Sequence, residues 1–546
     1  MQRAELLDGR TDAKVGSIED VTQPSPHASD ESTSPPIRRA RRKVGWAVGS
    51  LAAWIGGLVI FCELLAAVLE IPRAPLVHAI IFGMEGTETI HQPDDEVLWV
   101  LRPNATVNVY GDKISALGHR SPERPIVKGP QARRVVFLGD SVAFGAGVRY
   151  EHSFAGRIER WLADAKAGTW ESWNLAVGAH TAAQTARMLE RRALVLSPDI
   201  VVICAGSWSE YSPAIGEPDD AVLARLDESA RSHVVAALRG RGIVRILSWW
   251  TALGDGGRES AEATPQLAAF VTAGQAPGIV RVDLAAFRVH LLRMVERSRA
   301  AGAVPVLVVP GATSESRAHF PDSDRYAAAI RQVGKEMSVA VADVRAALAA
   351  SGADAVNFFD RVHLSEEGHR IAARVIAESL CSVPSPDLRG ISPQGIALPR
   401  SLDFARALRA IQRSGESESE AAAAAIRESY LHNWSSVMAS PPSELVIPVP
   451  DLPERFELCV GCAILEEGSS PIRFVVELES TGGVRTRLLE LERARTVRDV
   501  SDLVLDRVLG ARPAEGTRSL RFRVEGTGRT ALWIRPSIVE ILDSSR

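Results

Sequence analysis

One short stretch decides the fold, and it reads Arg134-Val135-Val136-Phe137-Leu138-Gly139-Asp140-Ser141. Its continuous apolar run is typical of a strand that is buried on both faces, as in a parallel sheet covered by helices. The Gly-Asp-Ser turn that follows is predicted to place Ser141 at the carboxyl edge of this sheet. In open α/β sheets that edge is where ligands bind. We therefore expect an α/β domain with Ser141 at its site.

Apolar strands and helices alternate along the chain after this stretch. Further strands are predicted over residues 173–175, 199–204, 303–309 and 339–342, and helices over residues 154–165, 181–194, 288–300 and 366–380. This alternation indicates a parallel sheet with helices on both faces, so residues 132–384 are predicted to form one three-layer α/β/α domain. Residues 210–280 interrupt the alternation and are interpreted as an insertion.

The amino-terminal part has the pattern of a membrane anchor. Residues 1–36 contain no Phe, Trp or Tyr and are rich in polar residues and Pro, which is typical of disorder. A basic cluster at residues 38–43 precedes an uncharged run whose length approaches the ~30 Å hydrocarbon core of a bilayer. We expect a disordered cytoplasmic tail over residues 1–43 and a transmembrane signal anchor over residues 44–69, with the α/β domain extracytoplasmic. A cleaved signal peptide and a buried helix are the alternatives.

The other segments differ in composition. Residues 70–131 are rich in turns and are predicted to be a membrane-proximal segment, and residues 385–440 a linker with helices, one of them over residues 416–430. Short strands with Gly-rich turns recur in residues 441–546, which indicates a β-sandwich domain. This domain is either a carbohydrate-binding module or a sandwich that only packs against the catalytic unit, and Trp533 is expected in its core.

Charge and cysteine content exclude several classes of function. The formal net charge of −4 gives no indication of a nucleic-acid partner. No metal-ligand spacing is found among the His, Cys, Asp and Glu residues, so neither a metal nor another cofactor is expected. Cys459 and Cys462 are the only close pair among five cysteines, and we interpret them as strand residues that an oxidising compartment could bridge.

A second motif, Phe359-Asp360-Arg361-Val362-His363-Leu364-Ser365, lies just before the last predicted helix of the α/β domain. Ser365 can cap that helix, and Asp360 is close enough for a turn to bring its carboxylate to the His363 imidazole. A nucleophilic serine needs a base of this kind, and the base needs an orienting carboxylate. The alternative is a purely structural loop, and His369 inside the helix is taken as structural.

Together the two motifs resemble the first and last sequence blocks of the SGNH (GDSL-type) hydrolase family, and Asn174-Leu175-Ala176-Val177-Gly178 resembles the second block. Residues 99–104 and 117–120 are similar to membrane-anchored bacterial members. The resemblance implies a flavodoxin-like α/β/α fold. It implies Ser141 as nucleophile, His363 as base and Asp360 as its partner. The N–H groups of Ser141 and Gly178 would form the oxyanion hole, with Asp140 and Gly206 at substrate-binding positions.

The third block departs from the family pattern. Family members have Gly-x-Asn-Asp after the third strand, whereas this chain has Ala205-Gly206-Ser207-Trp208-Ser209-Glu210. Aligning on Gly206 puts Trp208 in the place of the Asn, and sliding by one residue puts Ser209 there. Ser209 is the hydroxyl that could complete the oxyanion hole. Removing one such donor typically costs ~10²–10³ in rate.

Three functions follow from these patterns. The first is a membrane-anchored serine esterase or deacylase that hydrolyses carboxylic esters of an acylated envelope glycan or lipid through an acyl-enzyme. The second is an O-acyltransferase with the same three residues. The third is a catalytically weak envelope-binding protein, which the departure in the third block favours.

Overall fold

The structure is a computed structural model in which two compact units are found, residues 1–61 and 62–546. It describes residues 36–68, 90–107, 112–165, 169–214, 216–231, 246, 270, 272–276, 278–358, 360–383, 388, 401–403, 428–429, 434–439, 441–449, 452–464, 470–493, 505–527 and 531–541. The predicted tail over residues 1–35 and most of the predicted insertion lie outside these residues.

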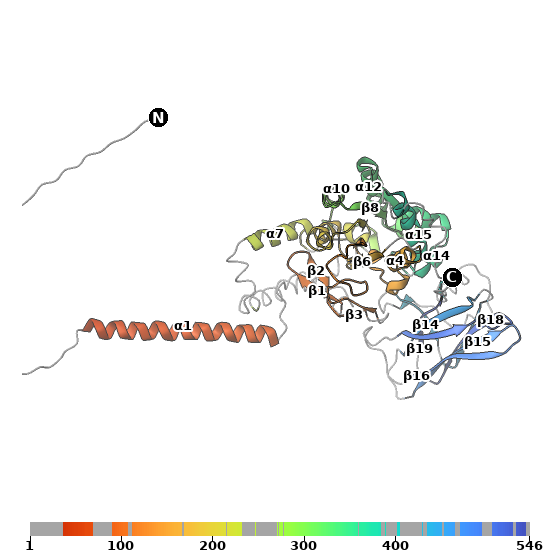
Figure 1. Ribbon diagram of the computed structural model, residues 1–546. Helices are drawn as coiled ribbons and strands as arrows, with labels where there is room; N and C mark the ends of the chain where they lie inside the picture. Colours follow the sequence, from red (N-terminus) through yellow and green to blue (C-terminus); the bar gives the residue numbers. More distant parts are fainter. Residues whose placement is uncertain are drawn as a thin grey trace, which may run out of the picture. The chain divides into compact units, whose positions relative to one another are not determined.

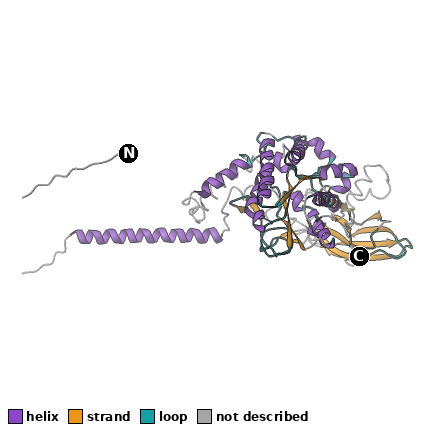
Figure 2. Ribbon diagram, turned by 45° about the horizontal axis from the view of Figure 1, so that its top comes forward, coloured by secondary structure: helices purple, strands orange, loops and turns teal. Residues whose placement is uncertain are grey.

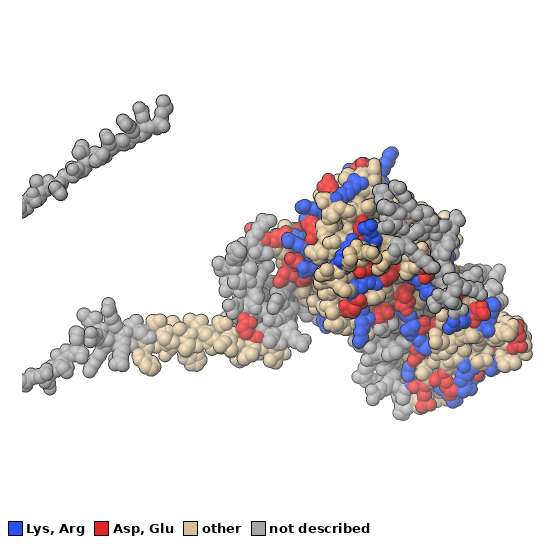
Figure 3. Space-filling view, in the orientation of Figure 1, with Lys and Arg blue, Asp and Glu red and all other residues tan. Residues whose placement is uncertain are grey.

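Helix α1 (Pro36–Val68) contains a stretch, Trp46–Leu65, that is long and apolar enough to cross a membrane. Over this stretch, Figure 3 shows almost no charged side chains. The helix begins before Val44, where the predicted span starts, so residues 36–43 are helical and not disordered. Proline is tolerated at the first helical position, and Arg, Ala and Lys favour helix, which explains the earlier start.

A five-stranded parallel sheet forms the centre of the α/β domain, as predicted. Its order is β6-β5-β7-β8-β9. The strands are β5 (Ala132–Gly139), β6 (Thr169–Asn174), β7 (Ile200–Cys204), β8 (Val304–Val309) and β9 (Ala340–Asp343). The first strand of the five lies second in the sheet, which is the flavodoxin-like order, and the order reverses between β5 and β7. A ligand site is therefore expected where these two strands end.

Helices form the outer layers of this domain (Figure 1). The longer ones are α4 (Phe154–Asp164), α5 (Ala182–Met188), α10 (Leu284–Ala300), α12 (Asp322–Met337), α13 (Val344–Ser351) and α15 (Glu366–Ser382). Helix α15 contacts both α4 and α13, whereas α10 contacts both α5 and α12. Shorter helices are α3 (Ser141–Phe144), α6 (Trp208–Tyr211), α11 (Ser314–His319) and α14 (Asp354–Asn357), and α7 (Asp219–Arg231) lies in the predicted insertion.

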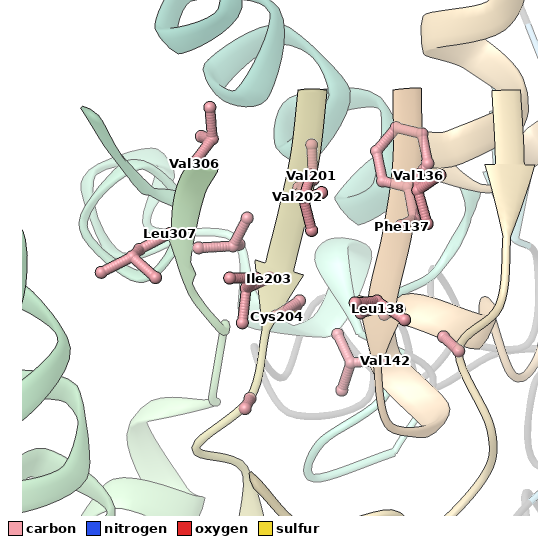
Figure 4. Packing of buried hydrophobic residues seen from close by; sticks show 14 of the residues in the cluster. Val136, Phe137, Leu138, Val142, Val201, Val202, Ile203, Cys204, Val306 and Leu307 are labelled. Atoms are coloured by element: carbon pink, nitrogen blue, oxygen red, sulfur yellow. The ribbon is translucent and has the colours of Figure 1, made fainter. Parts of the chain in front are cut away.

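The sheet interior is a continuous apolar core. Figure 4 shows the side chains of neighbouring strands side by side, among them Val136 and Phe137 of β5, Val201 and Val202 of β7, and Val306 and Leu307 of β8. All six are fully buried. Burial on both faces explains why these strands read as unbroken apolar runs and not as an alternation of polar and apolar residues.

The described part of the predicted membrane-proximal segment packs into the same core. It forms two hairpins, β1 (His91–Asp94) with β2 (Leu98–Leu101), and β3 (Thr106–Val107) with β4 (Asp112–Lys113). Trp99, Leu101 and Ile114 are buried in the core of the α/β domain. These residues are therefore part of the folded domain and not a spacer before it.

The carboxyl-terminal domain has two antiparallel sheets, and Figure 2 shows it as the strand-rich part of the molecule. One sheet has the order β11-β12-β19-β14-β17, with β10 also paired to β19, and the other β13-β18-β15-β16. The strands are β10 (Ser401–Asp403), β11 (Glu428–Ser429), β12 (Trp434–Ala439), β13 (Ser443–Pro448), β14 (Arg455–Ile464), β15 (Ile472–Ser480), β16 (Arg485–Arg493), β17 (Leu505–Ala511), β18 (Thr517–Glu525) and β19 (Ala531–Glu540).

Trp533 packs edge-on against Phe474 and Phe522 in the core of this sandwich, where it was expected. The predicted linker differs, because β10, β11 and β12 belong to the sandwich and residues 428–429 are strand and not helix. Strand β11 pairs with β12, which pairs with the distant β19, and this sheet pairing overrides the local helical preference of residues 428–429. Residues 416–427 lie outside the described part.

The two cysteines of the close pair are separate, buried thiols on β14. Successive side chains on a strand point to opposite faces, so residues three apart do not face each other. Burial raises the pKa of Cys459 to about 12, which leaves the thiol protonated. Cys459 and Cys462 are thus strand residues, as interpreted from the sequence, and the bridge that an oxidising compartment could form between them is absent from the structure.

Gly139 ends β5 with a φ of +146°, and a Cβ at this position would lie 1.9 Å from the carbonyl oxygen of Cys204. Gly139→Ala should therefore lower the free energy of unfolding by about 3 kcal/mol or more, since backbone strain adds to a clash. Gly302→Ala is the matched control, because Gly302 has a φ of +79° but open space around it. Scanning calorimetry of the purified chain should show a clearly larger loss for Gly139→Ala, and equal losses would contradict the argument.

Candidate active site

Ser141 lies at the point where the strand order reverses. It is the first residue of α3, and Asp140 caps this single turn by accepting a hydrogen bond from the Val142 N–H at 2.9 Å. The side chain of Asp140 is buried and also accepts a hydrogen bond from the Ser207 hydroxyl in the turn after β7. Asp140 therefore ties the two turns that follow β5 and β7.

His363 and Asp360 reach Ser141 from the loop that precedes α15. The Ser141 Oγ lies 2.8 Å from Nε2 of His363, and Nδ1 of the same ring lies 2.7 Å from a carboxylate oxygen of Asp360. The second carboxylate oxygen accepts the N–H groups of Val362 and His363 at 2.7 and 2.6 Å. Ser365 caps α15 as predicted, which fixes the loop that carries the imidazole.

His363 and Asp360 shift each other's pKa in opposite directions. Burial alone would lower the pKa of His363, but the adjacent Asp360 carboxylate outweighs burial and raises it above its ordinary value. Burial alone would raise the pKa of Asp360, but His363 and the two backbone N–H groups outweigh burial and lower it. Asp360 is therefore ionised at neutral pH and favours the protonated form of the imidazole, as a base that must accept a proton requires.

Gly178 lies on the loop that follows β6, next to the Ser141 turn. Asn174 at the end of β6 donates to the carbonyl of Ala143 at 3.0 Å, and the Val177 N–H donates to the carbonyl of Gly139 at 3.1 Å. Within the described part of the chain, no group accepts a hydrogen bond from the Gly178 N–H. The described residues therefore leave this N–H without an acceptor near the Ser141 turn.

The turn after β7 holds the residues of the divergent third block. Glu210 is buried and accepts hydrogen bonds from the N–H groups of Gly206 and Ala182, at 3.2 and 3.0 Å. Burial raises the pKa of Glu210 to about 8, so this carboxyl is largely protonated at neutral pH. Ser209 is 1% exposed, and its hydroxyl contacts no polar group of the described residues. Trp208 is half-buried and stacks on Phe270.

Some contacts at this site have no counterpart in the motifs. Arg120 donates to the carbonyls of Phe144 and Gly145, and Trp99 donates to the carbonyl of Gly178. The only signal in the sequence was the likeness of residues 99–104 and 117–120 to membrane-anchored bacterial hydrolases. Among the described residues, no cluster of His, Cys, Asp and Glu side chains has the arrangement of a metal site.

A flavodoxin-like sheet with this Ser-His-Asp chain at its switch point defines a serine hydrolase of the α/β class. Residues 137–371 match the model of the GDSL-like lipase/acylhydrolase family. The α/β domain therefore matches this family of acylhydrolases, and the chain is a serine ester hydrolase.

Among solved structures, the chain is similar to Axe2, an acetylxylan esterase from Geobacillus stearothermophilus, at 15% identity and a TM-score of 0.31, over 49% of this chain and 100% of the other. It is also similar to LAE5, an α/β hydrolase enzyme from the metagenome of Lake Arreo, Spain, at 14% identity and a TM-score of 0.32, over 48% and 99%. A comparison with curated proteins finds no match.

The raised pKa of His363 predicts a pH dependence. A general base acts only when neutral, so kcat/KM should rise with pH through the pKa of His363. Asp360→Asn removes the charge that raises this pKa, so the acid limb of the profile should move to lower pH, and the plateau should fall by about 10²–10⁴-fold. The control is Asp354→Asn, which removes a carboxylate that only accepts the Ser314 N–H. An unmoved acid limb in Asp360→Asn would contradict the pairing.

Proposed function

We propose that this chain is a membrane-anchored serine esterase or deacylase in which Ser141 is the nucleophile. The observation that carries the proposal is the unbroken hydrogen-bonded chain from Ser141 through His363 to Asp360. A serine hydroxyl is a weak nucleophile unless a base takes its proton, and a base is effective when a third group orients it. The three side chains have this order and these distances.

The reaction proceeds in two steps. Nε2 of His363 accepts the Ser141 proton as Oγ attacks the ester carbonyl, and the imidazolium is stabilised by Asp360. The N–H groups of Ser141 and Gly178 bind the oxyanion that develops. His363 then returns the proton to the leaving alcohol, and an acyl group remains on Ser141. Attack by water on this acyl-enzyme releases the carboxylic acid and restores the hydroxyl.

The substrate is an ester of an acylated envelope glycan or lipid, met outside the cytoplasm. Supporting this location, the apolar stretch of α1 follows a basic cluster at residues 38–43. Basic residues stay on the cytoplasmic side of a span, so the domains after it lie on the opposite side. An active site that follows a membrane span meets esters at the membrane or in the adjacent envelope.

The first test is labelling of the detergent-purified chain with a fluorophosphonate, which reacts with activated serines. The wild type should be labelled, and Ser141→Ala should not be labelled and should lose hydrolysis by at least about 10⁴-fold. Ser379→Ala, which removes a hydroxyl bonded only to the Val375 carbonyl on α15, should react like the wild type. A folded wild type without labelling would favour an envelope-binding role, and transfer of the acyl group to an added alcohol in place of hydrolysis would favour an acyltransferase.

The third oxyanion donor has two candidates. Trp208 directly follows Ser207, whose hydroxyl binds Asp140 beside the nucleophile, whereas the Ser209 hydroxyl is buried away from solvent. Trp208→Phe keeps the ring stacked on Phe270 but removes the indole N–H, so we expect kcat to fall by about 10²-fold with little change in KM. Ser209→Ala should change kcat by less than about threefold, since an oxyanion-hole donor must face the substrate. The reverse pattern would identify Ser209 as the donor.

A further inference from the structure

We propose that Trp99, on a hairpin that precedes the family-matched region, is a positioning residue that fixes Gly178 for catalysis. This inference rests on the proposed function, in which the Gly178 N–H binds the oxyanion. The family match begins at residue 137, whereas Trp99 belongs to the β1–β2 hairpin. A segment outside the matched region therefore contributes to the geometry of the site.

Gly178 needs such a support because a glycine backbone is more flexible than that of other residues. Gly178 rotates freely about both of its backbone bonds unless the two peptide groups beside it are held. The preceding peptide is held because the Val177 carbonyl accepts the His180 N–H at 3.2 Å. The following peptide is held because the Gly178 carbonyl accepts the Trp99 indole N–H at 3.0 Å. The indole therefore removes the remaining freedom of this glycine.

Trp99 is itself rigidly placed. It is 1% exposed, and its own carbonyl lies 2.9 Å from Nε2 of His180, whose ring packs edge-on against the indole. Burial lowers the pKa of His180 to about 3, so this ring is neutral and donates from Nε2 to that carbonyl. The guanidinium of Arg281 lies over the indole and donates to the carbonyl of Ala179 at 2.9 Å. Trp99 and the 178–180 loop thus form one interlocked unit.

The same amino-terminal segment also holds the turn that carries Ser141. Arg120 is 1% exposed, and its guanidinium donates to the carbonyls of Phe144 and Gly145 at 2.9 and 2.7 Å and to Asp112 at 2.9 Å. Its backbone N–H donates to the carbonyl of Asn174, where the loop of Gly178 begins. The loops that carry the N–H groups of Ser141 and Gly178 are therefore held by Arg120 and Trp99 of this segment.

The chemical consequence is specific. The oxyanion exists only in the transition state and the tetrahedral intermediate, so a donor that is less well placed weakens those states and not the bound ester. Loss of the Trp99 indole N–H should therefore lower kcat and leave KM nearly unchanged. A purely structural role would lower stability and leave the kinetic constants of the folded enzyme as they are.

The test compares Trp99→Phe with Trp173→Phe in the detergent-purified full chain. Trp173 is the matched control because it is equally buried in the same domain. Its indole N–H donates to the Glu171 carboxylate and not to the carbonyl of Gly178. With an aryl ester as substrate, we expect kcat of Trp99→Phe to fall by about 10-fold with KM within about twofold. Trp173→Phe should lose comparable stability and keep kcat within about twofold of the wild type.

A second variant covers the case in which Trp99→Phe does not fold. Benzothienylalanine at position 99 keeps the shape of the indole and replaces the N–H by sulfur, and it should show the same fall in kcat. If the wild type hydrolyses the ester and both position-99 variants have the same kcat as the wild type, the role of Trp99 is overturned and the proposed function is not. A rise confined to KM would also overturn it. A folded wild type that does not hydrolyse the ester or react with fluorophosphonate would overturn the proposed function, and this inference with it.

Discussion

The close approach of the ends of β5 and β7 is the constraint on which the site depends. Gly139 lies so near the Cys204 carbonyl that a side chain has no room, and the two turns that follow are then joined through the buried Asp140. A buried carboxylate is costly unless donors surround it, and the Val142 N–H and the Ser207 hydroxyl supply them. Ser141 and the third-block residues are placed by these same two turns.

Side chains that donate hydrogen bonds to loop carbonyl groups also fix the loops of the site. Trp99, Arg120 and Arg281 each donate to loop carbonyls from the core side. At Gly178 the peptide groups on both sides are held, the preceding one by the His180 N–H and the following one by the Trp99 indole, which leaves the Gly178 N–H little freedom to turn. Donors that are fixed before the substrate arrives need no reorganisation during the reaction, and this is the main source of electrostatic stabilisation in many enzymes.

The sequence predicted the α/β sheet and the meeting of the two motifs because each depends on local patterns, an apolar run or a turn with chemically distinctive residues. It did not predict the contacts of Arg120 and Trp99, because a side chain that binds distant carbonyl groups leaves no periodic trace. The strand β12 was missed for a related reason, since its partner β19 lies far along the chain. The helical start at Pro36 was missed because the basic cluster was grouped with the polar tail.

The bond between Ser141 and His363 joins residues 222 positions apart. Contacts of such long sequence separation form late in folding, because the intervening chain must be ordered first. A chain made from its amino end exposes the serine long before the imidazole exists. In the proposed mechanism the hydroxyl is thus an ordinary alcohol without a base during synthesis, and reactivity requires α15 to dock beside α4. By this mechanism, incomplete or unfolded copies would not react with the esters around them.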